Sequence, residues 1–120
     1  ALPPAAEGSE AVRDRVSRAR ARQAERFSRL RADGVRLNAD CPPALLDQVA
    51  CPDAAGEKLL RQAADAFYLS ARGYHRILRV ARTLADLDEM ERVHSTHIAE
   101  ALSCRGEEIR QPQLQKVAGL

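Results

Sequence analysis

Apolar residues recur every three or four positions along most of this chain, which is the spacing of amphipathic helices. In the first such segment they fall within about 80° of one another on a helical wheel. These residues are Val12, Val16, Ala19, Phe27 and Leu30. Ser9 precedes the segment as a candidate N-cap and Gly34 follows it as a terminator. The pattern therefore predicts a long helix over residues 10–32.

Four more helices are predicted further along the chain. A turn over 37–43 leads into a short helix that ends near Val49. Asp53, Ser70 and Ser95 are candidate N-caps for helices over 54–68, 71–88 and 96–105, and Gly106 ends the last of these. The expected fold class is therefore all-α, with about five helices in a lid-type bundle, because no segment shows a useful strand pattern.

The helix over 71–88 has the most regular pattern. Its expected core face consists of Tyr74, Ile77, Leu78, Ala81, Leu84 and Ala85. The opposite face, within about 40° of Arg72 on the wheel, carries Arg76, Arg79 and Thr83. We expect these residues to form an exposed ladder of arginines.

Composition limits the chain to one modest domain. It has 120 residues, 45% of them hydrophobic and 3% aromatic, so the core must be built from Leu, Val, Ile and Ala. We expect a linker over 1–8, a helical domain over 9–106 and a mobile tail over 107–120. The chain does not begin with Met, and we expect it to be an excised piece of a longer protein.

The sequence also indicates the cellular compartment of the protein. No stretch approaches the roughly 18 apolar residues of a membrane span, and the first ten residues lack a secretory pattern. Three cysteines at unrelated spacings fit free thiols in a reducing compartment better than a disulfide framework. We therefore expect a cytoplasmic protein with no membrane partner.

Charge is distributed unevenly, although its sum is small. The net charge is +2, which does not by itself indicate a nucleic-acid binder. Residues 1–36 carry nine arginines against five acids. One flank of the first helix carries Arg15, Arg18, Arg22, Arg26 and Arg29. That flank is either a solvated face or a surface that meets DNA phosphates through Arg15, Arg18, Arg22 and Arg26.

The sequence lacks the usual signatures of a catalytic or metal site. The six glycines are scattered, so there is neither a GxxxxGK[ST] phosphate loop nor a GxGxxG turn. His94, His97, Cys41 and Cys51 are candidate metal ligands, but there is no CxxC pair and the two cysteines are ten residues apart. We predict no metal site.

Neither the pair Cys104 and His97 nor His75 is expected to be catalytic. Cys104 and His97 are seven residues apart on one helix, about 10 Å along its axis, too far for direct proton transfer. His75 is expected to be a surface or boundary residue. The chain alone is therefore not expected to be an enzyme.

Arg72 is the best candidate for a functional side chain. It lies in the first turn after the Ser70 cap, where unpaired backbone N–H groups and the helix dipole favour an anion. Arg76 lies one turn further on. From spacing alone, this helix is either a surface helix that makes salt bridges or an anion-binding site.

Three stretches of the chain resemble a known family. They are LSARGYHRILRVARTLADL over 69–87, SEAVRDRVSRARARQAERF over 9–27 and HIAEALSCR over 97–105. Together they resemble the C-terminal domain of the magnesium chelatase subunit I-like AAA+ ATPases, closest to the competence-associated ComM type. Two stretches depart from the family pattern: 88–90 replaces a small Gly and Ser turn, and Ser103 and Cys104 replace Gln and Tyr.

The resemblance implies a helical lid behind an ATPase core that precedes it in the same chain and assembles with identical subunits into a hexameric ring. It implies that Arg72 is the second sensor arginine, which reaches the γ-phosphate of ATP, with magnesium, in the full-length protein. Arg76 is a further candidate ATP contact. The implied work is DNA remodelling or branch migration during DNA uptake, with magnesium insertion into a porphyrin as the alternative. A stand-alone helical interaction module that binds an acidic partner is the alternative from another class.

Overall fold

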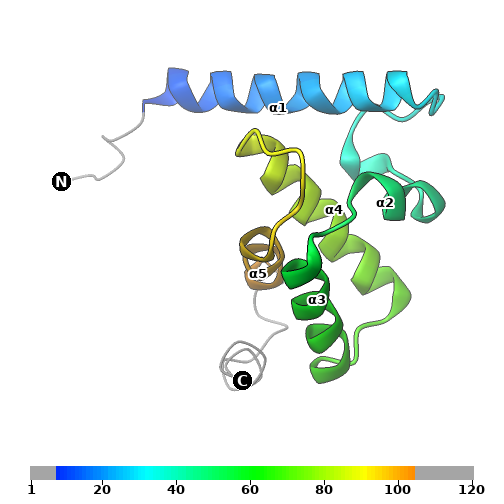
Figure 1. Cartoon of the computed structure of the whole chain (residues 1–120). Helices are drawn as coiled ribbons and strands as arrows, with labels where there is room; N and C mark the ends of the chain where they lie inside the picture. The colour runs from blue at the N-terminus through cyan, green and yellow to red at the C-terminus, as the bar shows by residue number, and fades with distance from the viewer. Residues whose placement is uncertain (1–7, 105–120) are drawn as a thin grey trace.

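The computed structural model describes residues 8–104, which form five α-helices and one short 3-10 helix (Figure 1). The helices are α1 (Ser9–Arg29), α2 (Pro43–Val49), α3 (Ala54–Ala66), α4 (Ala71–Leu87) and α5 (Ser95–Ser103), and the 3-10 helix is η2 (Asn38–Asp40). Within the described residues there is no strand, only an isolated bridge between Pro52 and Val93. The all-α prediction is confirmed.

The helices surround one hydrophobic core, and α4 is central to it. Helix α4 packs against α5, α1, α2 and η2, while α3 packs against α5. Fully buried side chains come from every α-helix; among the largest are Phe27, Leu46, Leu60, Ile77 and Ile98. On the predicted core face of α4, Ile77, Leu78, Ala81 and Ala85 are buried, and Tyr74 and Leu84 are half-buried against the core.

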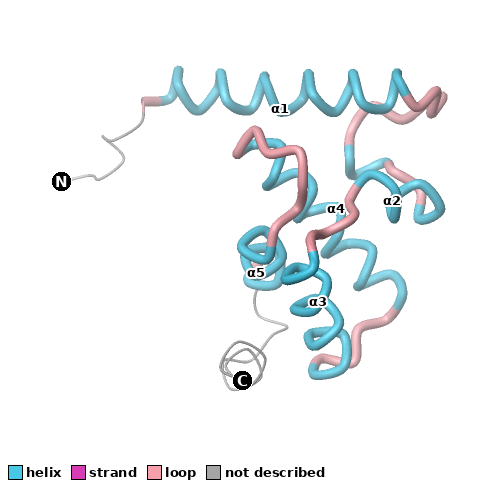
Figure 2. The backbone as a smooth tube through the Cα atoms, in the orientation of Figure 1, coloured by secondary structure: helices cyan, strands magenta, loops and turns pink. Residues whose placement is uncertain are grey.

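Helix α1 lies across the other helices as a separate bar (Figure 1). Its buried residues are Ala19, Gln23 and Phe27, at the helical spacing that faces α4. Every residue over 9–14 is exposed, and this end of α1 extends past the rest of the fold in the tube view (Figure 2). The first six residues of α1 therefore form an exposed helical end.

The ends of α1 differ from the sequence prediction. The helix begins at Ser9 itself with Gly8 as N-cap, and no side chain caps it. It ends at Arg29, before Gly34. The chain leaves the helix through Arg31, whose φ is 55°, and turns again at Gly34, whose φ is 81°. Gly34 therefore shapes the following loop instead of terminating the helix.

The caps of α3 and α4 agree with the prediction. The Asp53 carboxylate accepts the backbone N–H of Gly56 at 2.7 Å, and the Ser70 hydroxyl accepts that of Gly73 at 3.0 Å. Helix α3 ends at Ala66 instead of Tyr68, because Tyr68 has φ 52° and reverses the chain.

The start of α5 was predicted wrongly. Its N-cap is His94, not Ser95, and Ser95 is already helical. The backbone N–H of His94 is satisfied by Nδ1 of His97 at 3.0 Å. The predicted terminator Gly106, residues 1–7 of the predicted linker over 1–8 and the predicted tail over 107–120 lie outside the described residues.

Candidate functional site

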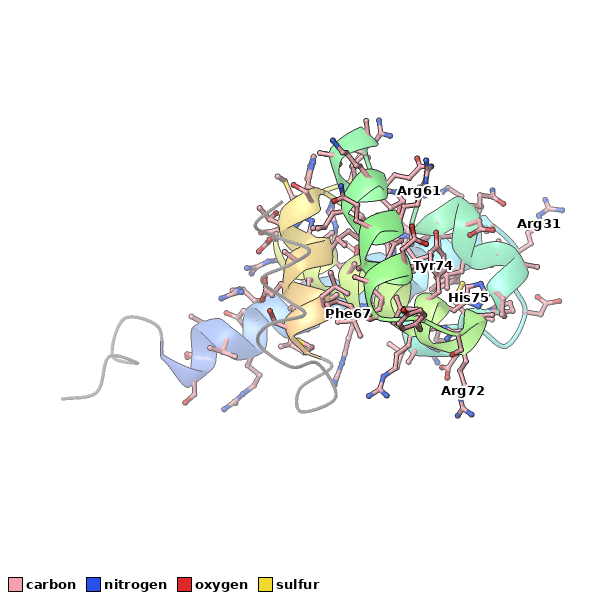
Figure 3. All side chains as sticks on the ribbon, turned by 90° about the horizontal axis from the view of Figure 1, so that it is seen from below. Arg31, Arg61, Phe67, Arg72, Tyr74 and His75 are labelled. Carbon is pink, nitrogen blue, oxygen red and sulfur yellow. The ribbon has the colours of Figure 1, made fainter. Side chains whose placement is uncertain are left out.

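Arg72 lies at the N-terminal end of α4, where the sequence placed it. It is exposed, and in the part of the chain that the structure describes it takes part in no ion pair or hydrogen bond of its side chain. Its side chain extends away from every ribbon in Figure 3. Ser70 fixes the first turn beneath it, so a permanent cation stands beside unpaired backbone N–H groups. This combination is suited to holding an anion.

The residues that follow Arg72 connect α4 to the core. Tyr74 is half-buried, and its ring meets that of His75 edge-on with centroids 5.9 Å apart. Burial, and then the charges of Asp47 and Glu57, raise the pKa of the Tyr74 phenol. His75 is itself half-buried, which agrees with its prediction as a boundary residue. Arg72 is thus an exposed charge on a well-anchored turn.

The expected exposed ladder on α4 is only partly present. Arg76 is exposed and remains near Arg72, one turn further along. Arg79 instead donates its Nε–H to the backbone carbonyl of Cys41 at 3.0 Å. Thr83 accepts a hydrogen bond from the amide of Asn38 at 3.0 Å. The ladder prediction fails here because η2 and the loop after it cover the C-terminal part of this face.

A buried ionic cluster joins α1 to α4, and sequence reasoning missed it. The Asp86 carboxylate accepts hydrogen bonds from both terminal nitrogens of Arg26, at 3.0 and 2.5 Å, and from the amide of Asn38 at 2.9 Å. It also forms an ion pair with Arg82 at 3.1 Å. Asp86 is fully buried and Arg82 is 3% exposed. The spacing of Arg82 and Asp86, four residues apart on a helix, was a visible signal.

Arg82 donates hydrogen bonds to the segment that leads into α5. Its terminal nitrogens donate to the backbone carbonyls of Met90 and Glu91, both at 2.7 Å, and of Val49 at 3.3 Å. Burial lowers the pKa of this guanidinium, and the adjacent Asp86 carboxylate opposes that effect. Arg82 is therefore a structural cation that crosslinks three parts of the fold.

The arginines predicted to meet DNA do not form one free basic face. Arg26 is engaged with the buried Asp86, and Arg18 lies 3.6 Å from Glu89. Arg29, on the same flank, lies 4.0 Å from Glu25. Arg22 and Arg15 are both half-buried. Contact of Arg15, Arg18 and Arg22 with DNA stays a prediction, whereas Arg26 has a structural partner.

The candidate metal ligands are occupied by other contacts. The His94 ring lies 2.7 Å from Asp53, and Nε2 of His97 lies 2.9 Å from Asp88. Within residues 8–104 no group of three His, Cys, Asp or Glu side chains is placed to hold a metal ion. Cys41 is buried, and burial raises the pKa of its thiol. Cys51 and Cys104 are exposed free thiols.

Comparison with known proteins defines the class. Residues 6–105 match the family model described as magnesium chelatase, subunit ChlI C-terminal. Because this match spans most of the chain, the protein belongs to that family. No helix in the described part is long and apolar enough to cross a membrane.

The chain is also similar to individual proteins. The chain is 37% identical over 101 residues to competence protein ComM of Haemophilus influenzae, a match that covers 82% of this chain and 18% of that protein. It is 40% identical over 99 residues to uncharacterised proteins of Mycobacterium bovis and Mycobacterium tuberculosis, covering 82% of this chain and 19% of each. The chain thus spans about a fifth of the length of these relatives. No solved structure matches the chain.

Proposed function

We propose that this chain is the C-terminal lid of a magnesium chelatase-like AAA+ ATPase and that Arg72 senses the phosphates of bound ATP. The observation that carries the proposal is the placement of Arg72: an exposed cation with no ionic partner in the described residues, on the capped first turn of α4. Family membership supports it, because the matching model describes a C-terminal domain.

In this proposal the chain acts only together with an ATPase core that precedes it in the full-length protein. ATP and magnesium bind to that core, and Arg72 approaches the terminal phosphate from the lid, either within one subunit or across a ring interface. A fixed guanidinium there stabilises the negative charge that develops during phosphoryl transfer. Arg76, exposed on the same face, is a candidate second contact.

Similarity to competence protein ComM favours DNA remodelling during DNA uptake, such as branch migration by a cytoplasmic hexameric ring. The second candidate is magnesium insertion into a porphyrin, which the description of the matching family model favours. An ATPase assay of the full-length protein distinguishes the two functions. Stimulation of ATP hydrolysis by branched DNA supports DNA remodelling, and stimulation by a porphyrin with magnesium supports magnesium insertion.

The sensor role is tested by Arg72→Ala in the full-length protein. Loss of one charged group that acts on transferring phosphate is expected to lower kcat at least about 100-fold, as removal of a comparable electrostatic donor does in other enzymes. Because the side chain is exposed, the domain should unfold at the same urea concentration as the unaltered protein.

Arg13→Ala is the matched control, since Arg13 is an exposed arginine on α1 that takes no part in the proposed site. It should leave ATP turnover unchanged. Normal turnover by the Arg72→Ala protein in an assembled ring would refute the sensor role. A full-length sequence without a phosphate loop would refute the whole proposal and leave the stand-alone interaction module.

A further inference from the structure

A hollow of about 410 Å³ opens between α1, the C-terminal end of α2 and the segment that leads into α5. Arginines from two helices line it; they are Arg22, Arg26, Arg29 and Arg82. Its volume is in the range of small-molecule sites. The hollow lies away from Arg72, because Arg82 follows ten residues later on the same helix, about 15 Å along its axis.

The cations of the hollow exceed the acids that pair with them. The single Asp86 carboxylate, behind the hollow, is shared by Arg26 and Arg82. Arg22 takes part in no ion pair in the described part of the chain, and neither does the carboxylate of Glu91 on the rim. Counting both rim acids, Glu25 and Glu91, as well as Asp86 leaves one positive charge in excess.

A second, independent feature is an unsatisfied donor. Arg82 is 3% exposed, and its Nε–H is the one buried side-chain polar group in the described residues without a hydrogen-bond partner. A buried donor left unpaired costs about 1–3 kcal/mol. The positive charges of Arg26 and Arg22 also act on Arg82, both lowering its pKa. An acceptor with negative charge would relieve both effects.

We propose that this hollow binds a phosphate group, with Arg22 and Arg29 contacting it at the mouth and Arg82 at the floor. Guanidinium groups fork onto two phosphate oxygens, and the negative charge of the phosphate offsets the repulsion that Arg26 and Arg22 exert on Arg82. The site takes a small phosphate or phosphomonoester, because a hollow of this volume between α1, α2, α4 and the loop before α5 has room for a compact group. It is separate from the ATP contact proposed for Arg72.

Titration of the 120-residue chain with inorganic phosphate tests this site, followed by amide chemical shifts at constant ionic strength, with sodium chloride as the reference titrant. We expect saturable shifts confined to the hollow, among them Arg22, Val49 and Glu91. Arg22→Ala should weaken phosphate binding about tenfold, the scale of one charge-assisted hydrogen bond. Arg13→Ala removes the same charge from the same helix outside the hollow, and should leave the affinity unchanged.

A parallel titration with short duplex DNA separates the two sources of phosphate. Binding of inorganic phosphate that DNA does not displace supports a small-molecule site. Shifts that grow linearly without saturation, or equal weakening by Arg22→Ala and Arg13→Ala, would overturn the proposal, since either indicates a nonspecific basic surface. These outcomes do not depend on ATP hydrolysis, so they are independent of the role of Arg72.

Discussion

At the residue scale, the single carboxylate of Asp86 is shared by two guanidinium groups, those of Arg26 and Arg82. Arg82 and Asp86 belong to α4, and their relation is visible as a spacing of four in the sequence. Arg26 comes from a helix 60 residues earlier, and no local pattern links it to Asp86. The sequence therefore suggests Arg26 as one more surface arginine, because nothing short-range marks it as buried.

Removal of the shared carboxylate should be strongly destabilising. Asp86→Ala leaves Arg82 buried without its counter-ion, and we expect the free energy of unfolding to fall by about 3–5 kcal/mol, as measured by urea denaturation. Glu89→Ala is the matched control. This substitution breaks the ion pair between Arg18 and Glu89, whose side chains are 52% and 55% exposed. Because both charges are in contact with water, the free energy of unfolding should fall by less than about 1 kcal/mol. Equal losses in the two variants would contradict a structural role for the buried cluster.

At the element scale, prediction succeeded where a side chain caps its own helix. Asp53 and Ser70 each precede their helix by one residue and bond to an N–H three residues on, so residue type and position are enough. It failed at α5, where Ser95 has the favoured residue type but His94 is the cap. There the cap depends on the buried ring of His97, which is held by Asp88. That geometry exists only after the helices pack.

The Asp53 cap predicts a pH dependence of stability. The backbone N–H of Gly56 and then the His94 side chain lower the pKa of Asp53 below its ordinary 3.8. Because the folded-state pKa is the lower one, the stabilising contribution is complete above the unfolded-state pKa and disappears as the pH falls through the folded-state pKa. Asn is an equally good N-cap without the charge.

We therefore expect the stability advantage of the unaltered chain over Asp53→Asn to be present in full above about pH 5 and to shrink as the pH falls below about 4. Urea denaturation across this range measures it. Ser70→Asn, at the other cap, involves no carboxylate and should show a difference that does not change with pH. A difference at Asp53 that grows on acidification would refute the assigned direction.

At the scale of the whole molecule, the helix count and the core faces followed from periodicity, because residues three and four apart necessarily share a face. Two features did not follow. Periodicity shows that α1 is amphipathic but not that its first six residues stay exposed. The cover over Arg79 and Thr83 comes from η2, a 3-10 helix too short to have a hydrophobic period. Arg72 was locatable from the sequence, whereas the hollow needs four segments brought together by folding: α1, α2, α4 and the loop before α5.

The partial docking of α1 predicts uneven protection of its amides. The residues over 9–14 are all exposed, whereas Ala19, Gln23 and Phe27 are buried. We expect hydrogen exchange over 12–16 to be at least tenfold faster than over 23–29, and the amides of central α4 to be the slowest. Hydrogen-exchange mass spectrometry resolves these peptides. Equal protection along α1 would show that its N-terminal end is covered.

The exposed N-terminal end of α1 also lies far from the residues that anchor this helix. If Gln23 is taken as the middle of the buried stretch, Ser9 lies about 21 Å away along the helix axis. A tilt of only 10° at that fulcrum would carry the Ser9 end through about 4 Å. The side chains that resist such a tilt include Ala19 and Phe27, which pack against the core. Polar contacts that also resist it are those of Gln23 with Asn38, Arg26 with Asp86 and Arg18 with Glu89. Sub-ångström adjustments around one carboxylate on α4 therefore correspond to displacements several times larger at the opposite end of α1.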